Sequence, residues 1–250
     1  MNTAAPHKWQ YVLLAGLVLS TVALVASFPP IAQDPAYHDF VDSRRLLGVP
    51  NAFDVLSNLA FLVVGLAGIR HCMVHDDGPM GAAWRVFFIG VTLVSAGSAY
   101  YHWHPTNSSL VWDRLPMTIA FMAIVVALVG ECLHAAFARR LLVPAVLVGV
   151  ASVVVWAQTD DLRFYAWVQF MPMLVLPVML FLFRIPYTKG YLLMLALAWY
   201  VLAKVMELLD AEIFALTGEL VSGHTLKHLC AAATCYCVLL LLQRRQPRTA

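Results

Sequence analysis

Eight long apolar runs dominate this sequence, and they constrain its fold more than any other feature. A helix that crosses a membrane needs about 20 mostly apolar residues. The runs that approach this length are Tyr11–Phe28, Phe53–Ile69, Val86–Tyr101, Leu115–Leu133, Leu141–Ala157, Phe164–Phe183, Tyr191–Leu209 and Leu220–Leu242. They are continuous and lack the alternation of barrel strands, so they predict an all-α integral membrane protein.

The composition supports this class and excludes others. Only 12% of the 250 residues are charged, about half of what a soluble domain carries. The net charge of +2 gives no reason to expect a nucleic-acid partner. The five cysteines contain no Cys-x-x-Cys pair, which predicts helix packing rather than a thiolate metal site or a disulfide framework.

The distribution of Lys and Arg predicts the orientation, because positive residues are enriched in cytoplasmic loops. If the N-terminus is inside, inner segments hold ten of the 16 Lys and Arg, outer segments hold four, and Lys204 and Lys227 lie within runs. Both termini are therefore expected in the cytoplasm. The first run could be a cleaved signal peptide, but it is longer than the usual apolar region of one, and we expect it to be retained.

Ionisable groups within apolar runs are costly and point to function. Ser98 and His102 end the third run, four residues apart on one helical face, and Asp113 begins the fourth. His224 and His228 begin the eighth run with the same spacing. The predicted topology brings these side chains to one level, near the outer (periplasmic or luminal) side of the membrane.

Three imidazoles with an open fourth position are the ligand set of a catalytic zinc site. In such a site Asp113 could hold and deprotonate a water molecule, and Ser98 could bind the oxyanion. The alternatives are haem ligation, hydrogen bonds between helices, or, for a single histidine such as His102, packing alone. His104, two residues after His102, is expected to point away.

Other polar residues have simpler explanations. Lys204 and Glu207 are spaced to neutralise each other on one helix. Asp39 and Asp42, before the second run, could bind calcium. That segment could equally be a solvated, capped helix start, with Ser57 and Asn58 packing between helices.

At these residues the sequence resembles the alkaline ceramidase family, within the membrane-hydrolase superfamily that also contains the adiponectin/progestin receptors. The matching segments are Asn51-Ala-Phe-Asp-Val-Leu-Ser57-Asn58, Gly97-Ser98-x-x-x-His102, Asp113-Arg-Leu-Pro-Met117 and His224-x-x-x-His228. The resemblance implies a seven-helix hydrolase core (37–243) after an extra N-terminal transmembrane helix and linker (1–36), with a basic cytoplasmic tail (244–250). It also implies Zn²⁺ on His102, His224 and His228, with Ser98 and Asp113 acting on the water and the amide of a ceramide-like membrane lipid. The products would be a fatty acid and a sphingoid base.

Two positions depart from the family pattern. Arg44 and Asn51 stand where the calcium-binding segment of eukaryotic ceramidases has an Asn and a Glu. We therefore expect Asp–Arg pairing in place of calcium. Three other functions stay open: hydrolysis of another lipid amide or ester, including a phospholipid, a zinc-containing lipid receptor or sensor, and a histidine-using transporter or haem electron carrier. The predicted inner loops are short, which disfavours a receptor, because a receptor needs cytoplasmic loops large enough to bind its partners.

Overall fold

The computed structural model describes residues 7–248, which are helical apart from loops and two isolated β-bridges. The helices are α1 (Lys8–Ser27), α2 (Ala52–Ser57), α3 (Leu59–Val74), α4 (Gly81–Trp103), α5 (Asn107–Cys132), α6 (Ala135–Thr159), α7 (Arg163–Leu182), α8 (Tyr191–Leu208), α9 (Asp210–Leu216) and α10 (Gly223–Arg244), with 3-10 turns η1 (Pro35–His38) and η2 (Gly78–Met80). In the described part of the chain, eight helical spans are long and apolar enough to cross a membrane, with α2 and α3 together forming one span. The predicted fold class, an all-α integral membrane protein, is confirmed.

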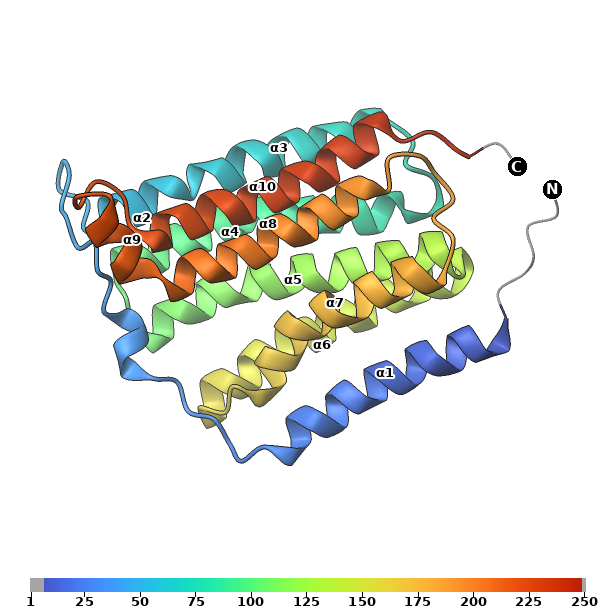
Figure 1. Ribbon diagram of the computed structural model, residues 1–250, viewed down its shortest axis with the longest axis horizontal. Coiled ribbons are helices and arrows are strands. Elements are labelled where there is room, and N and C mark those ends of the chain that lie inside the picture. The colour runs from blue at the N-terminus through green and yellow to red at the C-terminus, as the bar shows by residue number, and fades with distance from the viewer. Residues whose placement is uncertain (1–6, 249–250) are drawn as a thin grey trace.

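The long helices run side by side, and both ends of the described chain lie at one end of the bundle (Figure 1). Helix α4 packs against α3 and α5, α5 against α6, and α8 against α10. Helix α1 lies at the edge along α7, where the Trp167 indole donates to the Thr21 hydroxyl at 3.1 Å and the Gln10 amide donates to the Leu182 carbonyl at 2.6 Å.

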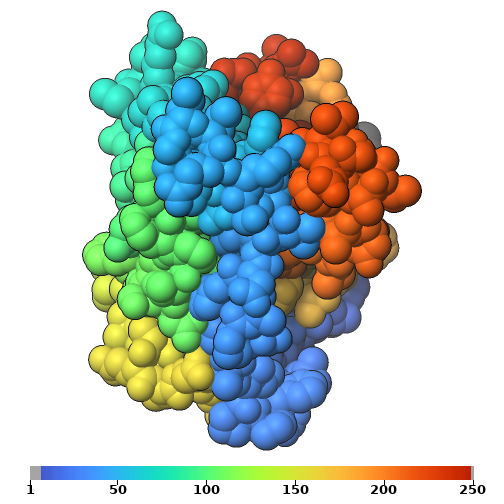
Figure 2. Space-filling view, turned by 90° about the vertical axis from the view of Figure 1, so that its left-hand side faces the viewer, coloured from blue at the N-terminus to red at the C-terminus, as the bar shows by residue number. Residues whose placement is uncertain are grey.

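The opposite end of the bundle is covered by the segment that joins α1 to α2. In Figure 2 this segment crosses the face between the start of α5 and α9. It is tied to the α6–α7 turn, because the Leu162 N–H donates to the Ile31 carbonyl at 2.8 Å and the Gln33 N–H donates to Asp160 Oδ1 at 3.1 Å.

Several helix starts differ from the starts of the predicted runs, and a capping residue explains two of them. Helix α5 begins at Asn107 rather than Leu115, because the Thr106 hydroxyl accepts a hydrogen bond from the Ser109 N–H at 3.2 Å and caps it. Helix α10 begins just after Ser222, which caps the Thr225 N–H in the same way at 3.0 Å. Hydropathy detects the apolar run, whereas the cap determines where the helix begins. Asp113 consequently lies within a helix and not at its start.

Candidate metal centre

Three buried histidines lie together at the end of the bundle opposite the two ends of the described chain. His102 comes from the last turn of α4, and His224 and His228 come from the first turns of α10. One ring nitrogen from each lies within 4.8 Å of the other two, and the ring centroids are 4.8 to 5.0 Å apart. The arrangement that the sequence predicted for these residues is present, and the group could hold a metal ion.

The hydrogen bonds around the rings fit metal ligation. His228 Nδ1 lies 2.7 Å from the Ser57 hydroxyl, which itself donates to the Asp54 carbonyl at 2.9 Å. His228 therefore carries its proton on Nδ1 and keeps a lone pair on Nε2. His102 Nδ1 is buried without a hydrogen-bond partner in the described chain. Neutral imidazoles with free lone pairs, oriented by a second layer of hydrogen bonds, are typical of metal sites.

His224 is held from two directions. Its backbone N–H donates to Asp210 Oδ1 at 2.7 Å, and its Nε2 lies 2.8 Å from the Lys227 ammonium. The same ammonium lies 3.2 Å from Glu207, which also pairs with Lys204. The predicted Lys204–Glu207 pair is present but is not isolated. A metal can bind His224 through Nε2 if Lys227 turns fully toward Glu207.

Ser98 and Asp113 line a cavity next to the histidines, and His228 lines it as well. Ser98 follows a glycine that lets α4 approach α5 closely. A Cβ atom on Gly97 would lie 2.0 Å from the Trp112 carbonyl oxygen and 3.4 Å from the Asp113 nitrogen. This close approach places the Ser98 hydroxyl and the Asp113 carboxylate on facing parts of two helices.

The cavity has a volume of about 360 Å³ and runs into the bundle from the histidine end. Its charged lining groups are at that end, and its remaining lining is mainly apolar side chains of α4, α5, α7, α8 and α10. Val91, Leu128, Leu180 and Val238 are among these apolar residues. The cavity therefore has a polar end beside the histidines, which could bind a metal ion, and an apolar chamber deeper in the bundle.

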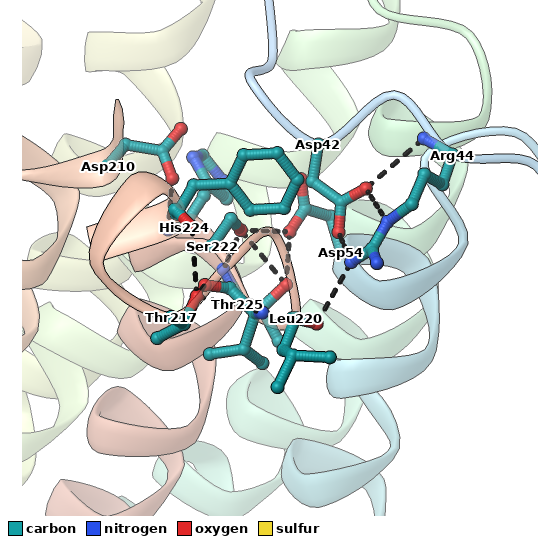
Figure 3. A network of polar contacts seen from close by, with 11 residues as sticks. Asp42, Arg44, Asp54, Asp210, Thr217, Leu220, Ser222, His224 and Thr225 are labelled. Atoms are coloured by element: carbon teal, nitrogen blue, oxygen red, sulfur yellow. Dashed lines mark hydrogen bonds and ion pairs between the residues drawn. The ribbon is translucent and has the colours of Figure 1, made fainter. Parts of the chain in front are cut away.

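A loop covers the histidines from outside. The Phe40 ring lies 4.6 Å from His102 and 5.0 Å from His224 between centroids. Next to it, Arg44 forms a two-point ion pair with buried Asp42, with contacts of 2.7 and 2.6 Å, and donates to the Leu220 carbonyl at 3.0 Å (Figure 3). The expected Asp–Arg pairing is therefore present.

A second buried carboxylate ties α2 to α10 (Figure 3). Asp54 Oδ1 accepts hydrogen bonds from Thr225 at 2.7 Å and Ser222 at 3.4 Å. Because α10 carries two of the histidines, Asp54 anchors the helix start on which the cluster depends.

Several residues of this region escaped the sequence analysis. Lys227 lay within the predicted run Leu220–Leu242, so the signal of a charge within a membrane span was available for it, whereas Arg114 lay just before the predicted run that begins at Leu115. Asp54 lay within the predicted run Phe53–Ile69 and carried the same signal, whereas Phe40 gave none, since its role depends on the path of the loop. His104 is exposed and is not part of the histidine group, in line with the prediction.

The comparisons with known proteins assign no family. No protein-family model matches the chain, and no curated protein matches it. The likeness to alkaline ceramidases therefore rests on the motifs alone.

Proposed function

We propose that this protein is a zinc-dependent membrane hydrolase that cleaves the N-acyl amide bond of a ceramide-like lipid to a fatty acid and a sphingoid base. One observation carries the proposal. Three buried histidines lie together, and one of them, His228, lines the polar end of an apolar cavity with Ser98 and Asp113. This combination matches what a lipid amidase needs: a metal site, an acid–base group and a chamber for an acyl chain.

A bound zinc ion would supply a Lewis acid that polarises the amide carbonyl and lowers the pKa of water. The protein groups perform the remaining tasks. Asp113 accepts a proton from the attacking water and delivers it to the amine as the C–N bond breaks. The Ser98 hydroxyl donates a hydrogen bond to the oxygen on which negative charge develops. The apolar cavity lining holds the acyl chain and excludes water from it.

We further propose that the histidine end faces the periplasm or lumen and that both termini are cytoplasmic. The excess of Lys and Arg in the predicted inner segments supports this orientation. The ends of the described chain lie at one end of the bundle, opposite the end that carries α9 (Figure 1) and the first turns of α10, which hold His224 and His228. A lipid would then reach the site from the outer half of the membrane.

The test is metal analysis of the purified protein together with a hydrolysis assay on a short-chain ceramide. We expect about one zinc per chain, and a sharp loss of both zinc and activity in His102→Ala, His224→Ala and His228→Ala. His104→Ala is the matched control, because this exposed histidine lies outside the cluster. Full zinc occupancy in all three cluster variants would overturn the metal assignment. Zinc binding without hydrolysis of any lipid amide or ester would overturn the enzymatic one.

A further inference from the structure

Two uncharged polar side chains line the cavity away from its charged end. Gln169 lies on α7 and is 9% exposed, and Tyr200 lies on α8. Both belong to the cavity lining. The Gln169 Nε2 donates to the Tyr200 hydroxyl at 3.4 Å, and the Tyr200 ring lies 5.9 Å from the ring of Phe121 on α5 between centroids. The Gln169–Tyr200 pair therefore interrupts an otherwise apolar stretch of the cavity wall.

This pair leaves hydrogen-bonding groups unused. Its contact of 3.4 Å is longer than an ordinary N–H···O hydrogen bond of about 2.7–3.2 Å. Within residues 7–248, no group accepts the Tyr200 hydroxyl proton and no group donates to Gln169 Oε1. That oxygen is not one of the closed-off polar atoms that lack a partner, so it is accessible from the cavity it lines. The pair thus offers one donor and one acceptor to whatever occupies the cavity.

The pair lies deeper in the bundle than the groups of the polar end. On α5, Phe121 is eight residues beyond Asp113, and on α8, Tyr200 is seven residues before Glu207, which pairs with Lys227. At 1.5 Å per residue these separations correspond to about 12 and about 10 Å. Carbon–carbon bonds of about 1.5 Å advance an extended chain by about 1.25 Å each. An acyl chain with its carbonyl at Asp113 would therefore bring its ninth to eleventh carbon, in about that range, to the pair.

We infer that the Gln169–Tyr200 pair is a subsite for a hydroxyl group on the acyl chain of the substrate, near the tenth carbon. The inference rests on the proposed function for the reaction itself, in which this hydroxyl takes no part. A hydroxyl can accept the Tyr200 proton and donate to Gln169 Oε1 at the same time. A methylene group in the same place would leave both protein groups unpaired in apolar surroundings, which weakens binding. The substrate is then a neutral hydroxyacyl amide, and the products are a hydroxy fatty acid and a sphingoid base.

The test compares three ceramides that share sphinganine as their base. Their acyl chains are 10-hydroxyoctadecanoyl, 2-hydroxyoctadecanoyl and octadecanoyl. We expect the wild-type protein to prefer the 10-hydroxy substrate over the octadecanoyl one in kcat/KM by at least about fivefold, the effect of one net hydrogen bond. Tyr200→Phe, which removes only the hydroxyl, should bring this ratio to about one, and Gln169→Leu should lower it. Tyr191→Phe is the matched control and should leave the ratio unchanged, because Tyr191 is an exposed tyrosine of the same helix outside the cavity lining.

Product binding provides a readout that is independent of hydrolysis. The two fatty acids 10-hydroxyoctadecanoic acid and octadecanoic acid compete with a fluorescent fatty acid for the full-length protein in detergent. We expect the hydroxy acid to bind at least about fivefold more tightly, and Tyr200→Phe to remove the difference. Equal binding of the two acids by the wild-type protein would count against the subsite.

The two proposals fail differently. If the wild-type protein hydrolyses the three ceramides equally well, or Tyr200→Phe lowers all three rates by one factor, the pair only ties α7 to α8, and the subsite is refuted while the amidase stands. If the 2-hydroxy substrate shows the same Tyr200-dependent preference, the placement near the tenth carbon is overturned. If no amide is hydrolysed but the hydroxy acid binds more tightly in a Tyr200-dependent way, the amidase is refuted and the subsite stands.

Discussion

The ring of His228 on α10 is oriented by the hydroxyl of Ser57 on α2. His228 Nδ1 donates to that oxygen at 2.7 Å, because the hydroxyl's own proton is given to the Asp54 carbonyl at 2.9 Å. The remaining ring nitrogen, Nε2, then keeps its lone pair. A short helix that ends at Ser57 thus fixes the tautomer of a residue more than 150 positions away in the sequence.

Loss of this hydrogen bond should weaken metal binding. Ser57→Ala is expected to lower zinc affinity by about 10–100-fold, the usual effect of removing a group that orients a ligating histidine. The measurement is a competition titration with a zinc-binding dye. Ser152→Ala is the matched control, since this buried hydroxyl donates to the Gly149 carbonyl at 2.7 Å on another helix. If the two variants bind zinc with equal affinity, Ser57 does not orient His228 for metal binding.

Asp113 should be needed for hydrolysis and not for metal binding. It lines the cavity with Ser98 but is not in the histidine group. Asp113→Asn should retain zinc and lose hydrolysis by about 10²–10⁴-fold, as expected for a missing general base. Ser98→Ala should have a smaller effect, because an adjacent water can replace a hydroxyl donor. Zinc analysis and single-turnover rates on the same preparations separate the two outcomes. Wild-type rates in Asp113→Asn would refute its catalytic role.

The sequence was sufficient to predict the helices and the histidine cluster. Long apolar runs predict spans because the membrane imposes one length, and the four-residue spacing of His224 and His228 puts both on one face. Alternation of the spans across the membrane then brings His102 to the same level. These are consequences of periodicity and topology, which a sequence displays directly.

The contacts around the cluster could not be predicted in the same way. Asp54 binds α10 and Phe40 covers the histidines because of the rotation of α2 and the path of a loop, neither of which leaves a periodic signal. The start of α5 was missed because Thr106, a polar residue outside the apolar run, caps the helix. Arg114 was passed over because its burial against Trp156 follows from the packing of α6 on α5.

A glycine at the α4–α5 contact should be needed for both stability and activity. Pro116 has no N–H to donate to the Trp112 carbonyl four residues earlier, and Gly97 packs against that oxygen, where a Cβ would lie at 2.0 Å. Gly97→Ala should destabilise the protein by about 1–3 kcal/mol or more, as overpacking does, and lower hydrolysis by separating Ser98 from Asp113. Thermal unfolding in detergent and the hydrolysis assay measure the two effects.

The control for this substitution is Gly16→Ala on α1, where an added Cβ meets nothing within 4 Å. It should leave both stability and activity near the wild-type values. If Gly97→Ala also behaves as the wild type, the two helices have room to adjust and the close approach is not required.

An ion pair at the α6–α7 turn should make stability depend on acidic pH. Hydrogen bonds from Arg163 lower the pKa of Asp161 to about 2, whereas an unfolded aspartate has a pKa of about 3.9. The pair therefore contributes its full stabilisation above about pH 4, and this contribution is lost as the pH falls toward 2. Thermal unfolding midpoints of the wild type and Asp161→Asn should differ at pH 6 and converge near pH 2. A difference that stays constant over this range would contradict the assignment.

Hydrolysis should be independent of calcium. Arg44 donates hydrogen bonds to both carboxylate oxygens of Asp42 at 2.7 and 2.6 Å and to the Leu220 carbonyl. The guanidinium therefore holds the loop over the histidines and occupies the position that a calcium ion would need. The hydrogen bond to Asp42 raises the pKa of Arg44 further, which keeps this charge in place. The measurement is hydrolysis in EGTA and in added calcium, with zinc maintained by a buffer that calcium does not disturb. Equal rates are expected, and Arg44→Gln should lower them by loosening the loop. A severalfold requirement for calcium in the wild-type protein would show that a cation binds at Asp42 in spite of the arginine.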